Sequence, residues 1–198
     1  RSACACGRIC DFPGAEATCS GGVCRMGDCF DGFQDLNGLA SDGCEYSCIP
    51  IAAIDTPDPL GIDENCDGID GDLTRSIFVS RGGSDFANSG LTPTSPVASL
   101  GRALTVAAAN PGRDAILVAT GSYTTSTIAL TDGGVSVYGG YDPNFRARSG
   151  VRPVFTSSDT TVLHVQGIRA SVVIEQMEFV TTNASTPGAS RFAVVVDD

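Results

Sequence analysis

The sequence predicts a mainly β chain in two parts: a disulfide-stapled N-terminal part, and a second part of short strands preceded by one helix. Two observations support this prediction. All nine cysteines lie in the first 66 residues, and short β-branched runs separated by Gly, Asp, Asn and Thr turns fill the chain after residue 110. A chain of 198 residues has room for a sizeable core and a small module beside it.

The cysteines indicate an oxidising compartment. Short Gly-rich gaps separate them and aliphatic periodicity is almost absent, so we expect residues 1–50 to form loops held by bridges and not a packed sheet. In a reducing cytosol these thiols would need metals, and the spacings of Cys/His fingers are missing. We therefore expect a secreted or cell-surface protein. Nine is odd, so at least one thiol is unpaired or joined elsewhere, and the disulfide candidates are Cys4, Cys6, Cys10, Cys19, Cys24, Cys29, Cys44, Cys48 and Cys66.

The acidic charge is concentrated in the first part. Residues 1–75 carry 14 acidic and 4 basic side chains, a net charge of −10, whereas residues 76–198 carry 9 and 8, a net charge of −1. An acidic surface suits cations and argues against nucleic acid or an anionic membrane as partner. We expect no membrane span, because no apolar run approaches the roughly 20 residues that a spanning helix needs.

A Pro-rich linker and an acidic loop at residues 51–75 contain the strongest candidate for a binding site. Carboxylates at alternate positions of a short loop repel one another unless a hard cation lies among them, and Ca²⁺ takes oxygen ligands. The spacing D-x-N-x-D-G from Asp63 matches the opening of the helix–loop–helix calcium pattern, but its twelfth position is Thr74 instead of Glu. A solvated acidic turn is the alternative. The predicted ligands are Asp63, Asn65, Asp67, the carbonyl of Ile69, Asp70 and Asp72.

The second part begins with a short run of β-branched and aromatic residues at 76–79, followed by one helix. Ser95 and Pro96 supply an N-cap and a proline at the first helical position, and apolar residues recur at helical spacing up to Asn110. We therefore expect a helix over residues 96–109. The strands expected after it are Ala115–Thr120, Thr127–Leu130, Val135–Tyr138, Thr161–Val165, Ser171–Glu175, Glu178–Val180 and Phe192–Val196.

Gly, Asp and Cys residues recur in a pattern in the first part, and the matching positions are Gly22, Cys24, Gly32, Phe33, Asp35, Asn37, Asp42, Gly43, Cys44 and Glu45. The pattern resembles the Cys-rich modules of secreted surface proteins of GC-rich Gram-negative bacteria. In that family such modules often precede an acidic, MopE-like metal-binding motif, and residues 65–70 look like a shortened version of it. The motif also resembles that of a copper-binding surface protein family of methane-oxidising bacteria. Copper ligands are scarce here, since the chain has one histidine and two methionines.

Four motifs follow one another in the second part: F-V-S-x-x-G-S-D at 78–85, P-V-x-S-L-x-x-A-L at 96–104, D-x-I-x-V-A-x-G-x-Y at 114–123, and G-V-S-V-Y-G-G-Y at 134–141. This succession resembles the N-terminal cap and first coils of right-handed parallel β-helix proteins of the pectin-lyase-like group. The resemblance implies that residues 76–198 form the beginning of such a domain, with the helix covering the first coil. A coil cannot bury its apolar face alone and has to stack on its neighbours.

The run Phe192–Val196 is continuously apolar, which indicates a strand buried on both faces. We therefore expect the edge at residues 192–196 to contact further β-helix coils or other copies of the chain.

Candidate catalytic residues are few. His164 is the sole histidine and lies in a strand of alternating residues. Asp197 and Asp198 resemble the paired carboxylates of β-helix glycosidases, but the match consists of these two residues alone, at the end of the sequence. We therefore expect an extracellular, non-catalytic structural, adhesive or assembly protein of a bacterial cell surface, stiffened by disulfides and calcium. The alternatives are a β-helix polysaccharide lyase or hydrolase with its groove outside this segment, and a surface metal-binding protein. An extracellular polysaccharide is a further candidate partner.

Overall fold

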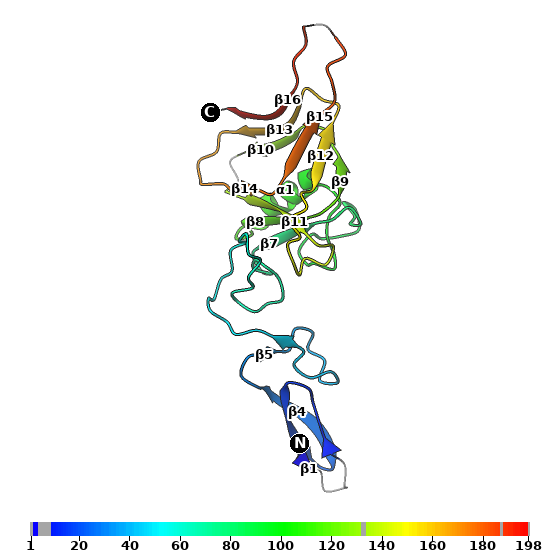
Figure 1. Ribbon diagram of the computed structural model, residues 1–198, viewed down its shortest axis with the longest axis vertical. Helices are drawn as coiled ribbons and strands as arrows, with labels where there is room; N and C mark the ends of the chain where they lie inside the picture. The colour runs from blue at the N-terminus through cyan, green and yellow to red at the C-terminus, as the bar shows by residue number, and fades with distance from the viewer. Residues whose placement is uncertain (1, 4–8, 132–133, 187, 198) are drawn as a thin grey trace. The chain divides into compact units, whose positions relative to one another are not determined.

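The computed structural model describes residues 2–3, 9–131, 134–186 and 188–197. The chain divides into two compact units. Unit 1 comprises residues 1–55 and 62–69, and unit 2 comprises residues 56–61 and 70–198. Strands outnumber helices throughout, as Figure 1 shows, so the predicted mainly β class is confirmed.

Unit 1 contains a β-hairpin that the sequence analysis did not predict. Strands β3 (Ala15–Ser20) and β4 (Val23–Cys29) pair antiparallel across a turn at Gly21 and Gly22, whose φ angles of 60° and 75° suit glycine. Two shorter pairs join β1 (Ser2–Ala3) to β2 (Ile9–Cys10) and β5 (Phe33–Gln34) to β6 (Tyr46–Ser47). The expectation of loops without a sheet was therefore wrong. Alanine, cysteine, methionine and glycine occupy the hairpin's more buried positions, so no run of β-branched residues marks the alternation of a strand.

Disulfides cross-link unit 1 in the pairs Cys10–Cys24, Cys29–Cys44 and Cys48–Cys66. Cys19 is disulfide-bonded as well. Cys4 and Cys6, which were also predicted to form disulfides, lie outside the described residues. Cys10, Cys44 and Cys66 are almost fully buried, so the cross-links contribute to the small core of this unit. The predicted disulfide-rich N-terminal part is confirmed.

Unit 2 is built around three parallel sheets, which the chain visits in rotation (Figure 1). The strand order of the first sheet is β14 (Ile174–Glu175), β11 (Ser136–Tyr141), β8 (Ala115–Ala119) and β7 (Ser76–Val79). The order of the second sheet is β15 (Glu178–Thr181), β12 (Val154–Ser157) and β9 (Ser122–Thr124). The order of the third sheet is β10 (Ile128–Thr131), β13 (Thr161–Gln166) and β16 (Phe192–Asp197). Three strands in succession, from β8 to β10, enter the first, second and third sheets. The same rotation repeats from β11 to β13 and from β14 to β16, so neighbours within a sheet are one circuit apart.

The second sheet was largely missed by the sequence analysis. Neither β9 nor β12 was predicted. In the first sheet, the strand expected at 171–175 is confined to Ile174–Glu175. Each of the two missed strands has three or four residues with one aromatic side chain among serines, threonines or valine. Runs of this length carry too few residues to establish a period of two.

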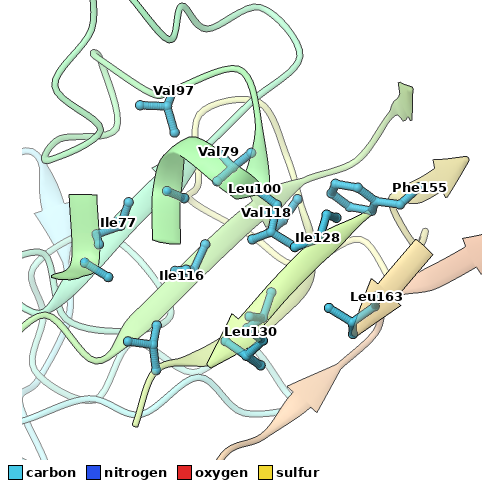
Figure 2. Packing of buried hydrophobic residues seen from close by; sticks show 14 of the residues in the cluster. Ile77, Val79, Val97, Leu100, Ile116, Val118, Ile128, Leu130, Phe155 and Leu163 are labelled. Atoms are coloured by element: carbon cyan, nitrogen blue, oxygen red, sulfur yellow. The ribbon is translucent and has the colours of Figure 1, made fainter. Parts of the chain in front are cut away.

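The core of unit 2 consists of ladders in which residues of like chemistry lie beside one another on neighbouring strands. Register aligns Ile77, Ile116, Val137 and Ile174 in the first sheet, Tyr123, Phe155 and Phe179 in the second, and Ile128, Leu163 and Val194 in the third. The Tyr123 and Phe155 rings stack with centroids 4.7 Å apart, and the Phe155 and Phe179 centroids are 5.8 Å apart. Figure 2 shows several of these side chains turned toward a common interior.

Helix α1 (Leu100–Ala109) packs on β7 and β10 and buries Leu100, Ala103, Val106 and Ala107 in the same core. A helix here was predicted, but it begins four residues later than expected. Its N-cap is Ser99, whose hydroxyl accepts a hydrogen bond from the backbone N–H of Arg102 at 3.1 Å. The earlier residues are extended, because the N–H of Val97 donates to the carbonyl of Phe78 at 2.9 Å.

The last strand of each sheet leaves apolar side chains exposed. Ile174 of β14 and Val180 of β15 are each 37% exposed, and in β16 the exposed fractions are 54% for Phe192, 43% for Val194 and 71% for Val196. Register places Val194 beside the buried Leu163, so this side chain continues an interior ladder. Its exposure therefore results from the lack of a further neighbour among the described residues, and not from an outward orientation.

Candidate metal centre

The acidic loop of unit 1 is fixed by a disulfide and by two unusual backbone conformations. Cys66 is joined to Cys48, and the sulfur of Cys48 lies 3.5 Å from the carbonyl oxygen of Asp63. Cys66 has a φ angle of 61° and Gly68 a φ angle of 96°, both in the left-handed region. The φ angle of Gly68 favours glycine, and a Cβ there would also lie 2.7 Å from Cδ1 of Leu36, so that side chain would have to move. These restraints curl residues 63–69 into a compact turn.

Asp63 is the centre of this turn. Its Oδ1 accepts a hydrogen bond from the N–H of Asp67 at 3.2 Å, and its Oδ2 accepts one from the N–H of Gly68 at 2.8 Å. The hydroxyl of Tyr46 donates to the same Oδ2 at 2.8 Å. Three donors therefore orient this carboxylate toward the inside of the loop, which is the first requirement for a preformed ligand.

Asn65 and Asp67 complete the arrangement. The Oδ1 of Asn65 accepts a hydrogen bond from the N–H of Asp67 at 3.0 Å, and its Nδ2 donates to Oδ2 of Asp67 at 3.0 Å. The Oδ1 of Asp67 accepts from the N–H of Ile69 at 3.3 Å. The structure thus brings together the side chains of Asp63, Asn65 and Asp67, three of the six predicted ligands. Ile69 lies two residues after Asp67 in the same unit.

Tyr46 is partly buried beside the carboxylates of this loop. Burial, the hydrogen bond to Asp63 and the nearby charges of Asp63, Asp67 and Asp55 raise the pKa of Tyr46 to about 12. Asp55 is 3% exposed and accepts a hydrogen bond from the N–H of Glu64 at 3.3 Å. A cation bound among these carboxylates would relieve their mutual repulsion.

The remaining predicted ligands, Asp70 and Asp72, belong to unit 2 and make other contacts. The Oδ1 of Asp72 accepts hydrogen bonds from the N–H of Thr74 at 2.8 Å, the hydroxyl of Thr74 at 2.6 Å and the N–H of Arg75 at 3.2 Å. It therefore closes a turn before β7. Asp70 is 1% exposed and its Oδ1 accepts from the N–H of Asp58 at 3.0 Å.

Asp70 also faces Arg148, in a buried charged network that sequence reasoning missed. The Arg148 Nε lies 3.8 Å from Oδ2 of Asp70, and its side chain is 2% exposed. Its Nη1 donates to the carbonyl of Asp58 at 2.8 Å and its Nη2 to Oε1 of Glu175 at 3.0 Å. The guanidinium carbon lies 5.5 Å from the ring centroid of Tyr141, whose hydroxyl donates to the carbonyl of Asp70 at 2.7 Å. No local sequence signal connects residues 70, 148 and 175.

Other candidate residues do not converge on a common site. The Nε2 of His164 on β13 lies 2.7 Å from Oδ2 of Asp197 on β16, on the exposed face of that sheet. Asp198, the other member of the suggested carboxylate pair, lies outside the described residues. Within the described part of the chain, no three His, Cys, Asp or Glu side chains are grouped closely enough to hold a metal ion on their own. Asn65, which supplies an amide oxygen, is not of these types.

Comparisons of this chain with family models, curated proteins and solved structures found no match. In the described ranges, no helix has the length and apolar character that crossing a bilayer requires.

Proposed function

We propose that this chain is an extracellular, non-catalytic structural protein in which a calcium-held, disulfide-stapled module accompanies the coils of a parallel β-helix. The main support for this proposal is the strand order of unit 2. Three sheets visited in rotation, with like residues stacked in ladders, describe a chain that winds around one apolar interior. A stacked solenoid presents an extended surface, which suits a structural or adhesive role.

Calcium is the proposed cofactor of unit 1. We assign its ligands to the side-chain oxygens of Asp63, Asn65 and Asp67 and to the carbonyl of Ile69. The support is that hydrogen bonds from the loop's own N–H groups already turn these side chains inward, so little reorganisation is needed. Asp70 and Asp72 are left out of this set, because each serves a contact within unit 2.

The proposed location outside the cell is supported by the disulfides. Cross-links at Cys10–Cys24, Cys29–Cys44 and Cys48–Cys66 would not persist in a reducing compartment. The charged network of Arg148 supports the non-catalytic assignment, because its donors bond backbone carbonyls and carboxylates that hold the loop at Asp58 beside β14. These contacts are those of a structural brace.

Calorimetric titration of the oxidised protein with Ca²⁺ tests this proposal. We expect one saturable site in the wild type and its loss in Asp67→Ala, which removes a ligand of the loop. Asp31→Ala is the matched control, since Asp31 is an exposed acidic residue of the same unit and its removal changes the net charge equally. Absence of binding at millimolar Ca²⁺ in the wild type, or equal loss of binding in both variants, would refute the assignment.

A further inference from the structure

Strand β16 forms one edge of the third sheet, and its sequence is self-complementary when two copies are aligned antiparallel. Within the described residues, β16 pairs on one side only, with β13. Residues 191–197 read Arg-Phe-Ala-Val-Val-Val-Asp, with a cation at one end and an anion at the other. We propose that two copies of the chain pair through β16, antiparallel across a two-fold axis at Val194.

The register follows from the faces of the strand. Phe192, Val194 and Val196 share one face, because side chains alternate along a strand, and Val194 and Val196 lie beside the core residues Leu163 and Val165 of β13. In an antiparallel pair of β16 strands, interior residues lie opposite interior residues only if the residue numbers of the two paired positions add up to an even number. A slip by one residue would place interior side chains opposite exterior ones.

Pairing centred on Val194 satisfies this condition and aligns the charges. It places Val194 opposite the same residue of the second copy, Phe192 opposite Val196, and Arg191 opposite Asp197. A shift by two residues in either direction would lose both Arg191–Asp197 pairs. The Asp197 side chain is 54% exposed and can reach outward while it contacts His164, and Arg191 bonds the carbonyls of Ser158 and Asp159.

At the opposite edge of the sheet, α1 packs on β10, so that edge differs from the one that β16 presents. A contact between two identical β16 edges closes as a dimer instead of growing into a fibre. The exposed side chains of Ile174 and Val180, on the last strands of the other two sheets, would add to the apolar surface covered.

Sedimentation equilibrium of the oxidised protein tests the pairing. We expect a mass of twice the chain's 20.3 kDa at micromolar concentrations. Val194→Lys places two like charges across the axis and should weaken dimerisation at least about tenfold. Thr131→Lys, on the exposed face of β10 at the other edge of the same sheet, is the control and should leave the dimer intact. A wild-type monomer up to about 100 μM, far above the micromolar range of specific complexes, would overturn the inference.

Disulfide trapping tests the register and does not depend on the lysine variant folding well. A cysteine at position 194 should form a covalent dimer under mild oxidation, because antiparallel residues opposite one another bring their Cα atoms within bridging distance. Ala193→Cys is the matched control, since position 193 faces position 195 of the partner and not itself. Cross-linking of Ala193→Cys as readily as Val194→Cys, relative to the wild type, would refute the two-fold pairing. A monomer that still binds Ca²⁺ at the acidic loop would refute the dimer alone.

Discussion

Replacing Arg148 by methionine is expected to destabilise unit 2 strongly, because it leaves the buried carboxylate of Asp70 without a positive charge beside it. Methionine retains much of the apolar volume but removes the charge that faces Asp70, whose side chain is fully buried. Breaking a buried ion pair by removing one partner typically costs about 3–5 kcal/mol. The Nε to Oδ2 distance of 3.8 Å is long for a charged hydrogen bond, so we expect the lower part of this range, about 3 kcal/mol.

The other partners of Arg148 refine the expectation. Its hydrogen bond to Glu175 involves a carboxylate that is 31% exposed, so Glu175→Gln should cost only about 1 kcal/mol or less. Removing both charges, in Asp70→Asn with Arg148→Met, should restore part of the stability lost in the single variant, because no unpaired charge is then buried. The pair should therefore show a coupling free energy of about 1–3 kcal/mol in a double-mutant cycle.

Urea unfolding followed by tyrosine fluorescence and far-ultraviolet circular dichroism provides the free energies. Tyr141 lies under Arg148 and the chain has no tryptophan, so tyrosine emission should be sensitive to this region. A loss of about 3 kcal/mol corresponds to a fall in melting temperature of about 6–12 °C for a domain of 150–250 residues. Because unit 2 is somewhat smaller than this, we expect a fall of at least about 6 °C. A stability of Arg148→Met within about 1 kcal/mol of the wild type, or a double variant no more stable than the single one, would contradict a buried ion pair between Arg148 and Asp70.

Three further predictions concern the aromatic ladder, the acidic loop and its disulfide. Phe155→Ala, at the centre of a buried stack, should cost about 3–5 kcal/mol in denaturant unfolding, and a cost below about 1 kcal/mol would contradict the ladder as the core of unit 2. Because the pKa of Tyr46 is raised to about 12 in the folded state from an ordinary 10.0, its contribution to stability is present below pH 10 and is lost as pH rises toward 12. Tyr46→Phe should flatten the stability of unit 1 in that window, and an unchanged profile would count against the Asp63 contact. Replacing Cys48 and Cys66 by serine should cost about 3 kcal/mol and weaken Ca²⁺ binding, and titration at wild-type affinity would show that the loop forms without the cross-link.

The sequence was sufficient for the features that depend on neighbouring residues. Cysteine spacing predicted a disulfide-rich first part, and β-branched runs such as Ala115–Thr120 and Thr161–Val165 predicted strands that the structure contains. Alternate carboxylates from Asp63 onward identified a loop whose side chains do turn toward one another. In each case the signal is local, since the interacting groups lie within a few residues.

Features that depend on distant residues could not be predicted. The helix begins at Leu100 because Val97 pairs with β7, and that competition with the Ser95–Pro96 signal is invisible without the sheet. The role of Asp70 is set by Arg148, which is 78 positions further along the chain, so an acidic residue assigned to the loop serves a brace in unit 2. In unit 1, disulfides replace the apolar residues whose spacing would have revealed the hairpin.

Thermal unfolding of the oxidised protein with Ca²⁺ and with a chelator tests the central claim most directly. A ligand at 100 times its dissociation constant stabilises the folded state by about 2.7 kcal/mol, so calcium should raise the melting temperature of the transition that includes unit 1 by several degrees. Asp67→Ala should abolish this difference, while Asp31→Ala should retain it. Identical melting of the wild type with calcium and with chelator would contradict the account of a calcium-held module.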